Sequence, residues 1–226
     1  MEIIQNEKRL NRLMLQYDLP GRFRYYEEYK PYFHLVRFAK HEIIYQKQGQ
    51  RQYLLFFITG KIKVCCDMSN GKSLLVCFYT SFQLLGDLEF YEIDTSTTTI
   101  TAVEPCLCIA LRITSIRRRL LEDNLFLQFL SRSLADKLTR VSRNNSINLL
   151  YPLESRLASY IYQVSENNYF CENLTQLSEL LGTSYRHLLR VMKEFVAQGI
   201  LEKSSKGYII KDSWRLMELA EDLYLT

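Results

Sequence analysis

The segment from residue 173 to residue 207 constrains the fold of this chain most strongly. Within it, Gly182 permits the positive φ of a tight turn, and Ser184 can cap a following helix with its hydroxyl group. The apolar runs at 200–201 and 208–210 predict two short strands joined by a turn. Leucines at helical spacing predict the apolar face of a short helix before Gly182: Leu174, Leu177, Leu180 and Leu181. The segment therefore predicts a helix-turn-helix followed by a β-wing.

The second predicted helix of this segment carries hydrogen-bond donors on its outer faces. These outer positions are Tyr185, Arg186, His187, Arg190 and Lys193. Six basic residues occur against two acidic ones between 182 and 211, although residues 151–226 together contain eight Lys/Arg and ten Asp/Glu. Positive charge gathered in this way is typical of phosphate contact, and donors at the start of a helix suit the major groove. We therefore expect the chain to bind double-stranded DNA.

The composition is that of a folded globular protein, with 226 residues, of which 47% are hydrophobic and 24% charged. No apolar run approaches the ~18–20 residues that a membrane-crossing helix requires. The amino-terminal residues also lack the apolar core of a signal peptide. We therefore expect a cytoplasmic protein without a membrane partner.

The six cysteines show no zinc-site or C-x-x-C spacing, so we expect no metal site. Cys106 and Cys108 would share one face of a predicted strand, where Cys65 or Cys66 could meet them from a neighbouring strand. Two interpretations stay open: buried thiols that fill the strands, and a thiol-redox switch at Cys106 and Cys108.

Between residues 34 and 113 the sequence is typical of a β-structure. Short runs of β-branched, aromatic and cysteine residues alternate with turn signals, and the pair at 70–71, Asn-Gly, predicts a hairpin. Helices are predicted before this region, at 2–16 and 22–30. The predicted strands are 36–38, 43–45, 53–58, 62–66, 74–79, 98–103 and 106–111. Many short strands at near-regular spacing imply a barrel or jelly roll.

A long helix is predicted over 114–148, with a narrow apolar stripe formed by Leu127, Leu130, Leu134, Leu138 and Val141. The stripe suits packing on the chain's own β-roll, on a second copy of the helix, or on both. The fold class is therefore α+β. We expect N-terminal helices and a β-roll sensor domain over 1–113, a central dimerisation helix over 114–148, and a winged helix-turn-helix domain over 149–226.

This order of elements resembles the Crp/Fnr family of transcriptional regulators. The most specific matches are LFFITGKIK at 55–63, GDLEF at 86–90 and the segment 182–199. The phrases LGTSYRHLL and KSSKGYIIK are particularly similar to the YeiL-like branch. The resemblance implies an N-terminal cyclic-nucleotide-binding-like β-roll and a homodimer formed on the central helix. It also implies a pseudo-palindromic operator read in successive major grooves, and RNA polymerase as a partner if the protein is an activator.

The resemblance also assigns DNA-contacting residues. Tyr185, Arg186 and Arg190 fall at base-reading positions, and Arg190 would reach guanine O6 and N7 in a bidentate fork. Because Tyr185 and Arg186 differ from the common family residues, we expect an operator unlike the common consensus. Other residues fall where relatives hold phosphate, with helix capping and solvent exposure as the alternative: Ser184, His187, Asn173 and Thr175.

The effector site departs from the family pattern. Cyclic-nucleotide members place an Arg-Ser pair where this chain has Thr97 and Thr98, and no Arg or Lys lies between Lys72 and Arg112. A buried phosphate without a cation is costly, so we expect no tight binding of cAMP or cGMP, although an unknown small-molecule effector stays open. No cysteine precedes Cys65, which disfavours the family's iron–sulfur chemistry, and we expect no cofactor. The implied pocket residues are Gly86, Asp87, Leu88, Glu89, Thr97, Thr98, Val141 and Ser142.

Two other functions are weighed against a sequence-specific transcription factor. One is a small-molecule-binding β-roll module without DNA activity. The other is a jelly-roll metalloenzyme, which needs two or three histidines and a carboxylate around a metal. Only His34 and His41 lie near the predicted roll, and no nucleophile-base set appears. We therefore expect no catalytic residues and no enzymatic activity.

Overall fold

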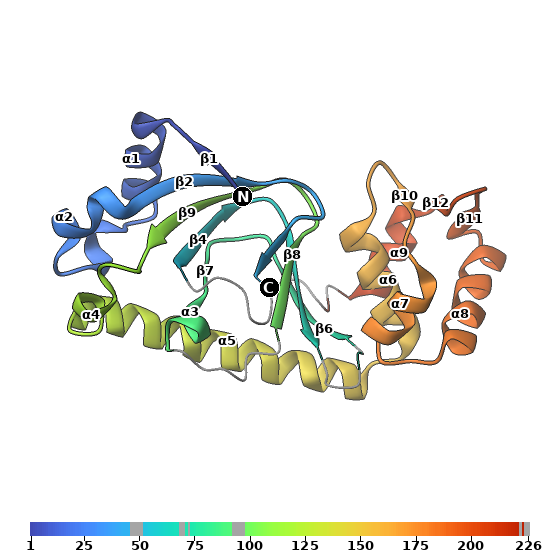
Figure 1. Cartoon of the computed structure of the whole chain (residues 1–226). Coiled ribbons are helices and arrows are strands. Elements are labelled where there is room, and N and C mark those ends of the chain that lie inside the picture. The colour runs from blue at the N-terminus through green and yellow to red at the C-terminus, as the bar shows by residue number, and fades with distance from the viewer. Residues whose placement is uncertain (46–51, 68–70, 72, 92–97, 222, 224–226) are drawn as a thin grey trace. The chain divides into compact units, whose positions relative to one another are not determined.

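The computed structural model describes residues 1–45, 52–67, 71, 73–91, 98–221 and 223 (Figure 1). Contacts divide the chain into two compact units. The first consists of Met1–Val64 and Tyr79–Arg140, and the second of Cys65–Phe78 and Val141–Thr226. Each unit is described by itself below. No helix in the described part of the chain combines the length and apolar character needed to cross a membrane.

One sheet of the first unit has the strand order β1-β2-β9-β4-β7, with antiparallel neighbours. Its strands are β1 (Glu2–Ile4), β2 (Phe33–Phe38), β9 (Cys106–Arg112), β4 (Tyr53–Thr59) and β7 (Gln83–Leu85). The apolar run of β9 is buried from Cys106 to Leu111 because the strand lies between β2 and β4. This central position explains why β9 reads as a continuous apolar run rather than as an alternating one.

A second sheet has the order β3-β8-β5-β6, formed by β3 (Ile43–Tyr45), β8 (Thr98–Ala102), β5 (Ile62–Asp67) and β6 (Ser73–Tyr79). The predicted strands are thus confirmed as elements, and the jelly-roll prediction with them. Gly71 of the predicted hairpin has a φ of +80°. Asn70 of that turn lies outside the described residues.

Two predictions for the amino-terminal region are wrong. Residues 2–4 form β1 rather than a helix, because Ile3 pairs with Val36 at the free edge of β2. The helix α1 (Glu7–Gln16) begins only after Asn6, whose side chain caps it by accepting from the Arg9 amide. The helix predicted over 22–30 is reduced to α2 (Tyr26–Tyr29), which lies between the 3₁₀ turns η1 (Pro20–Arg22) and η2 (Lys30–Tyr32).

The helix predicted from residue 114 is interrupted at Asp123. A short helix α4 (Arg117–Leu120) precedes the turn, and the long helix α5 (Asn124–Leu150) follows it. The buried Asp123 carboxylate accepts from the amides of Leu125 and Phe126 at 3.1 Å, and from the Arg24 amide at 2.9 Å. It therefore caps α5 and joins it to the loop before α2.

The first part of α5 packs on the chain's own roll. Phe126 stacks on Phe23 with ring centroids 5.3 Å apart, and Leu130 is fully buried in the same core. Figure 1 shows α5 running along one side of the strands of this unit, with α3 (Asp87–Phe90) beside it. Leu127 and Leu134 are partly buried against the core, whereas Leu138 is 71% exposed. The predicted stripe thus divides into an inward part and an uncovered part.

The second unit contains the predicted helix-turn-helix and wing. From residue 153 onwards its elements are α6 (Leu153–Val164), β10 (Tyr169–Phe170), α7 (Leu174–Leu180), α8 (Tyr185–Ala197), β11 (Leu201–Lys203), β12 (Tyr208–Ile210) and α9 (Ser213–Ala220). The strands form a sheet in the order β10-β12-β11. Apolar side chains of α7 and α8 meet in the core, where Leu177, Leu188 and Phe195 are buried. The strand β10 is too short for the sequence pattern to predict it.

Candidate nucleic-acid interface

The turn between α7 and α8 has the geometry that the sequence predicts. Gly182 has a φ of +61°, a conformation that glycine adopts without steric penalty. Ser184 caps α8, since its hydroxyl oxygen accepts from the His187 amide at 3.2 Å. The Thr183 hydroxyl lies 3.4 Å from the His187 ring nitrogen Nδ1. These contacts fix the start of α8, which is where the predicted base-reading residues lie.

The outer faces of α8 present the predicted donors to solvent. Tyr185, Arg186 and Arg190 are exposed, and the inward positions Val191 and Met192 are buried. Figure 1 shows α8 beside the wing formed by β11 and β12. The fold therefore presents the donors at the N-terminal end of α8 on one accessible surface.

Arg190 has an intrahelical partner that the sequence analysis did not consider. Its Nε atom lies 3.7 Å from Glu194 Oε1, one turn further along α8. Both side chains are largely exposed, so the pair contributes little to stability. The guanidinium can exchange this partner for a base edge at small cost.

The predicted phosphate-contacting residues also serve as helix caps. The Asn173 side-chain oxygen accepts from the amides of Thr175 and Gln176 at 2.9 and 3.2 Å, so Asn173 caps α7. Ser184 caps α8 in the same way, while Thr175 is exposed and His187 half-buried. Asn173 and Ser184 thus act as helix caps, as the alternative interpretation expects. Phosphate contact by the four residues stays a prediction.

The wing adds exposed cations that the sequence analysis did not assign to the site. The Ser204 amide donates to the Gly207 carbonyl at 2.8 Å and closes the wing turn. Lys203 at the end of β11 and Lys206 in the turn are exposed. The basic count over 182–211 already includes both residues, and their place in the predicted wing was the signal that could have assigned them to the site.

A cation approaches the predicted effector motif, contrary to the sequence-based expectation. Lys137 of α5 places its Nζ atom 2.7 Å from Asp87 Oδ2 and donates to the Leu84 carbonyl at 2.6 Å. The Asp87 side chain is 5% exposed and that of Lys137 19%. Counting cations between Lys72 and Arg112 missed Lys137 because it comes from a distant helix. Its position three residues after Leu134, on the inward side of α5, was the available signal.

The Lys137–Asp87 pair changes the reason for expecting weak cyclic-nucleotide binding. The positive charge beside the motif is already neutralised by a buried carboxylate of the same motif. A cyclic phosphate would have to displace this carboxylate or leave it without a partner, and both are costly. We therefore still expect weak cyclic-nucleotide binding, because the cation beside the motif is already paired and not because a cation is missing.

The remaining effector-pocket residues are placed as follows. Gly86 has a φ of +88°, and a side chain there would collide with the Tyr45 hydroxyl group. Leu88 is exposed, and Glu89 and Thr98 are half-buried. Val141 and the exposed Ser142 belong to the second unit. Thr97 lies outside the described residues, and a pocket formed by all of these residues stays a prediction.

The thiols of Cys106 and Cys108 are buried in β9, which pairs with β2 and β4. The expectation that Cys65 or Cys66 meets them from a neighbouring strand is therefore wrong, because β5 belongs to the other sheet. Burial raises the pKa of Cys106 to about 11 and the pKa of Cys108 further above its ordinary value. Because the thiolate is the reactive form, this environment suits an inert thiol better than a redox switch.

We expect peroxide to affect DNA binding equally in the wild type and in the Cys106→Ser/Cys108→Ser variant. The raised pKa values keep both thiols protonated at neutral pH, so that they react slowly. Titration of a labelled operator before and after peroxide treatment measures the effect, with thermal melting to confirm that the variant is folded. A peroxide response present in the wild type and lost in the variant would restore the redox hypothesis.

The histidines of the metalloenzyme alternative lie on separate elements. His34 is half-buried in β2, and His41 occupies a turn with a φ of +67°. Among the described residues, no three His, Cys, Asp or Glu side chains gather in a way that could hold a metal ion.

Comparisons with known proteins agree for both parts of the chain. Residues 35–123 match a cyclic nucleotide-binding domain model, and residues 155–219 match a Crp-like helix-turn-helix domain model. The chain is 34% identical over 189 residues to regulatory protein YeiL of Escherichia coli, covering 84% of this chain and 86% of that protein. It is 22% identical over 182 residues to the CRP-like cAMP-activated global transcriptional regulator of Mycobacterium tuberculosis, covering 76% and 80%.

Solved structures show the same fold. A crp/fnr-family protein from Eubacterium rectale superposes with a TM-score of 0.73 at 15% identity, over 86% of this chain and 93% of that one. The c-di-GMP responsive global regulator CLP of Xanthomonas campestris gives 0.60 at 16% identity, over 82% and 97%.

Proposed function

We propose, from the premise that this chain belongs to the Crp/Fnr family of transcriptional regulators, that α8 reads base edges through Tyr185, Arg186 and Arg190. The observation that supports this assignment best is the exposure of these donors at the capped start of α8. Proteins of this family bind DNA and typically act as dimers. A guanidinium is well suited to guanine because it can donate to O6 and N7 together.

The backbone contacts in this proposal come from the surrounding caps and the wing. Ser184, His187, Asn173 and Thr175 lie at the helix starts, where amides and side-chain donors can meet phosphate oxygens. We add Lys203 and Lys206 of the wing to this group, because both are exposed beside α8. These contacts would position α8 without reading sequence.

Replacing Arg190 with alanine tests the base-reading assignment. We expect the loss of one bidentate contact to cost about 1–3 kcal/mol in operator affinity and to relax preference at one base pair in each half-site. The measurement is selection of bound duplexes from a random DNA pool, followed by titration of the selected operator and its single-base variants. Lys206→Ala is the matched control, which should weaken all sequences equally and reduce the salt dependence. If Arg190→Ala behaves like the control, Arg190 contacts phosphate instead.

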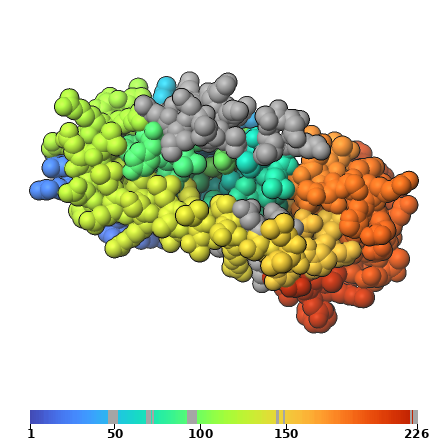
Figure 2. Space-filling model, turned by 90° about the horizontal axis from the view of Figure 1, so that it is seen from below, coloured from blue at the N-terminus to red at the C-terminus, as the bar shows by residue number. Residues whose placement is uncertain are grey.

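The dimer in this proposal forms on the uncovered side of α5. Ser131, Ala135 and Leu138 are exposed there at alternating spacings of four and three residues, which is the spacing of a helix-pairing seam. Figure 2, which views the molecule from below, shows α5 at the molecular surface. Small residues at Ser131 and Ala135 would let a second copy approach closely, with Leu138 as the apolar contact. A symmetric dimer fits the pseudo-palindromic operator expected for this family.

The remaining assignments complete the proposal. The sensor, dimerisation and DNA-binding regions are 1–113, 114–148 and 149–226, and RNA polymerase is a partner if the protein activates transcription. We propose that the β-roll does not respond to cAMP, because Lys137, the cation beside the effector motif, is already paired with Asp87. The curated relatives are named as regulators, and we propose a non-catalytic role in the cytoplasm, where the chromosome of a bacterium lies. The alternative of a β-roll module without DNA activity is not favoured, since the helix-turn-helix matches its family model.

A further inference from the structure

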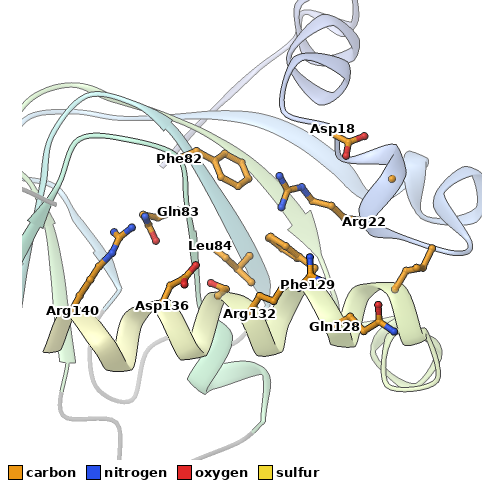
Figure 3. Close-up of a pocket in the computed structure, with 13 residues that line it drawn as sticks. Asp18, Arg22, Phe82, Gln83, Leu84, Gln128, Phe129, Arg132, Asp136 and Arg140 are labelled. Atoms are coloured by element: carbon orange, nitrogen blue, oxygen red, sulfur yellow. The ribbon is translucent and has the colours of Figure 1, made fainter. Parts of the chain in front are cut away.

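A cavity of about 600 Å³ lies in the first unit between η1, β7 and α5 (Figure 3). Its volume falls within the range of about 300–1,000 Å³ that is usual for small-molecule sites. The effector motif at 86–89 does not contribute to its described lining. The cavity is therefore separate from the effector position that the family resemblance implies.

Arginines from separate elements line this cavity: Arg22 from η1, and Arg132 and Arg140 from α5. The Arg22 guanidinium lies over Phe129 and Phe82, at 4.3 and 5.0 Å from the ring centroids. Its Nε atom donates to the Tyr17 carbonyl at 3.2 Å. Figure 3 shows this guanidinium pointing into the space beside Phe82. The Arg22 charge is thus held rigidly at one wall.

Arg140 lies at the other end of the cavity, where Figure 3 shows its side chain rising from α5 towards Gln83. The Arg140 guanidinium lies 5.7 Å from the Tyr79 ring centroid. Its Nη1 atom is buried and has no hydrogen-bond partner among the described residues. A buried guanidinium donor without an acceptor costs folding free energy. A ligand that brings an acceptor to this end of the cavity would remove that cost.

The acidic residues of the lining, Asp18 and Asp136, do not supply that acceptor. Asp136 lies on α5 four residues from both Arg132 and Arg140. Burial lowers the pKa of Arg22, and the charge of the Asp18 carboxylate opposes this effect only in part. Within the described part of the chain, no carboxylate lies within ion-pair distance of Arg132 or Arg140. The rest of the wall combines uncharged polar side chains with apolar ones, among them Phe82, Leu84, Leu125 and Phe129.

We propose that this cavity binds a small organic anion, in which a carboxylate or phosphate group is attached to an apolar body. The oxyanion would accept from Arg140 and Arg132, and the body would lie against Phe82, Leu84 and Phe129. Guanidinium groups recognise both kinds of oxyanion through paired, charge-assisted hydrogen bonds. This binding is independent of DNA recognition, so its test does not rely on the function proposed above.

Isothermal titration of the full chain with phenyl phosphate and phenylacetate tests the proposal. We expect one of them to bind saturably at one site per chain. It should bind more tightly than inorganic phosphate, which lacks the apolar body, and more tightly than benzyl alcohol, which lacks the oxyanion. The preferred probe identifies the head group. Saturable binding of neither probe overturns the proposal.

Variants locate the site. Arg140→Gln and Arg132→Gln should each weaken the preferred probe at least about tenfold, because each removes a charge-assisted pair. Arg118→Gln is the matched control and should leave the affinity unchanged, since Arg118 is 95% exposed on α4 and lies outside the cavity. Thermal melting checks that each variant is folded. Unchanged affinity in both Arg140→Gln and Arg132→Gln overturns the assignment to this cavity.

Discussion

The Lys137→Met variant should lose about 3 kcal/mol of unfolding free energy, because it leaves the Asp87 carboxylate buried without its partner. The ion pair measures 2.7 Å, and Lys137 also satisfies the Leu84 carbonyl at 2.6 Å. Methionine matches the alkyl part of the lysine side chain and lacks the terminal ammonium group, so it removes the charge and the donors. Urea denaturation of the wild type and the variant measures the loss.

The Lys137→Met/Asp87→Asn double variant separates charge from packing. It should recover part of the loss, since an amide is far less costly to bury than an unpaired carboxylate. Lys8→Met on the exposed face of α1 is the control and should change stability by less than about 0.5 kcal/mol. Equal stability of Lys137→Met and the wild type would show that Asp87 is not desolvated in the protein.

The same pair has a consequence for the effector site. Lys137 connects α5 to the motif that, in cyclic-nucleotide members of the family, leads to the phosphate-binding Arg-Ser pair. In this chain the connection is internal and needs no ligand. A substitution of Lys137 should therefore act mainly on the packing of α5 against the roll, and any effect on ligand affinity should follow from that change.

The Leu138→Glu variant should dissociate the proposed dimer and weaken operator binding by about 100-fold or more. Two glutamates facing each other on the seam would be desolvated and would repel each other. Each protomer would then bind one half-site without the gain in effective concentration that linkage to a second half-site provides. Sedimentation measures the mass in solution, and fluorescence anisotropy measures the affinity for the selected operator.

A matched variant on the same helix controls for added charge. Arg143→Glu places a carboxylate on an exposed position of α5 that is off the seam, and it should leave the protein dimeric. Far-UV circular dichroism should show the same secondary structure for Leu138→Glu as for the wild type, because Leu138 is exposed within one chain, although loss of the dimer should lower the melting temperature. A dimer that persists in Leu138→Glu would mean that another surface joins the two copies.

The sequence pattern predicted most of the elements because their signals are local. The strands of the roll follow from short β-branched and aromatic runs between turns, and β9 is found where the run at 106–111 predicts it. The turn at Gly182 and the cap at Ser184 depend on residues within one turn of each other, and both were predictable. The capping roles of Asn173 and Ser184 were named as an alternative for the same reason.

The errors arose where a distant partner decides the structure. Glu2–Ile4 could continue a helix, but pairing with β2 makes it a strand. Asp123 stops the helix expected from 114 because it binds the amide of Arg24, a residue far away in sequence. Cys106 and Cys65 were expected on adjacent strands, yet the order of strands in a sheet cannot be read from spacing alone.

The sequence by itself determined the family, the succession of roll, long helix and winged helix-turn-helix, and the donors presented by α8. These properties depend on periodicity, turn residues and local charge, which act over a few neighbouring positions. Only the tertiary structure decided that Lys137 pairs with Asp87, and that Arg22, Arg132 and Arg140 line one cavity. Such juxtapositions arise from the packing of α5 against distant segments, and side-chain burial and pairing depend on that packing.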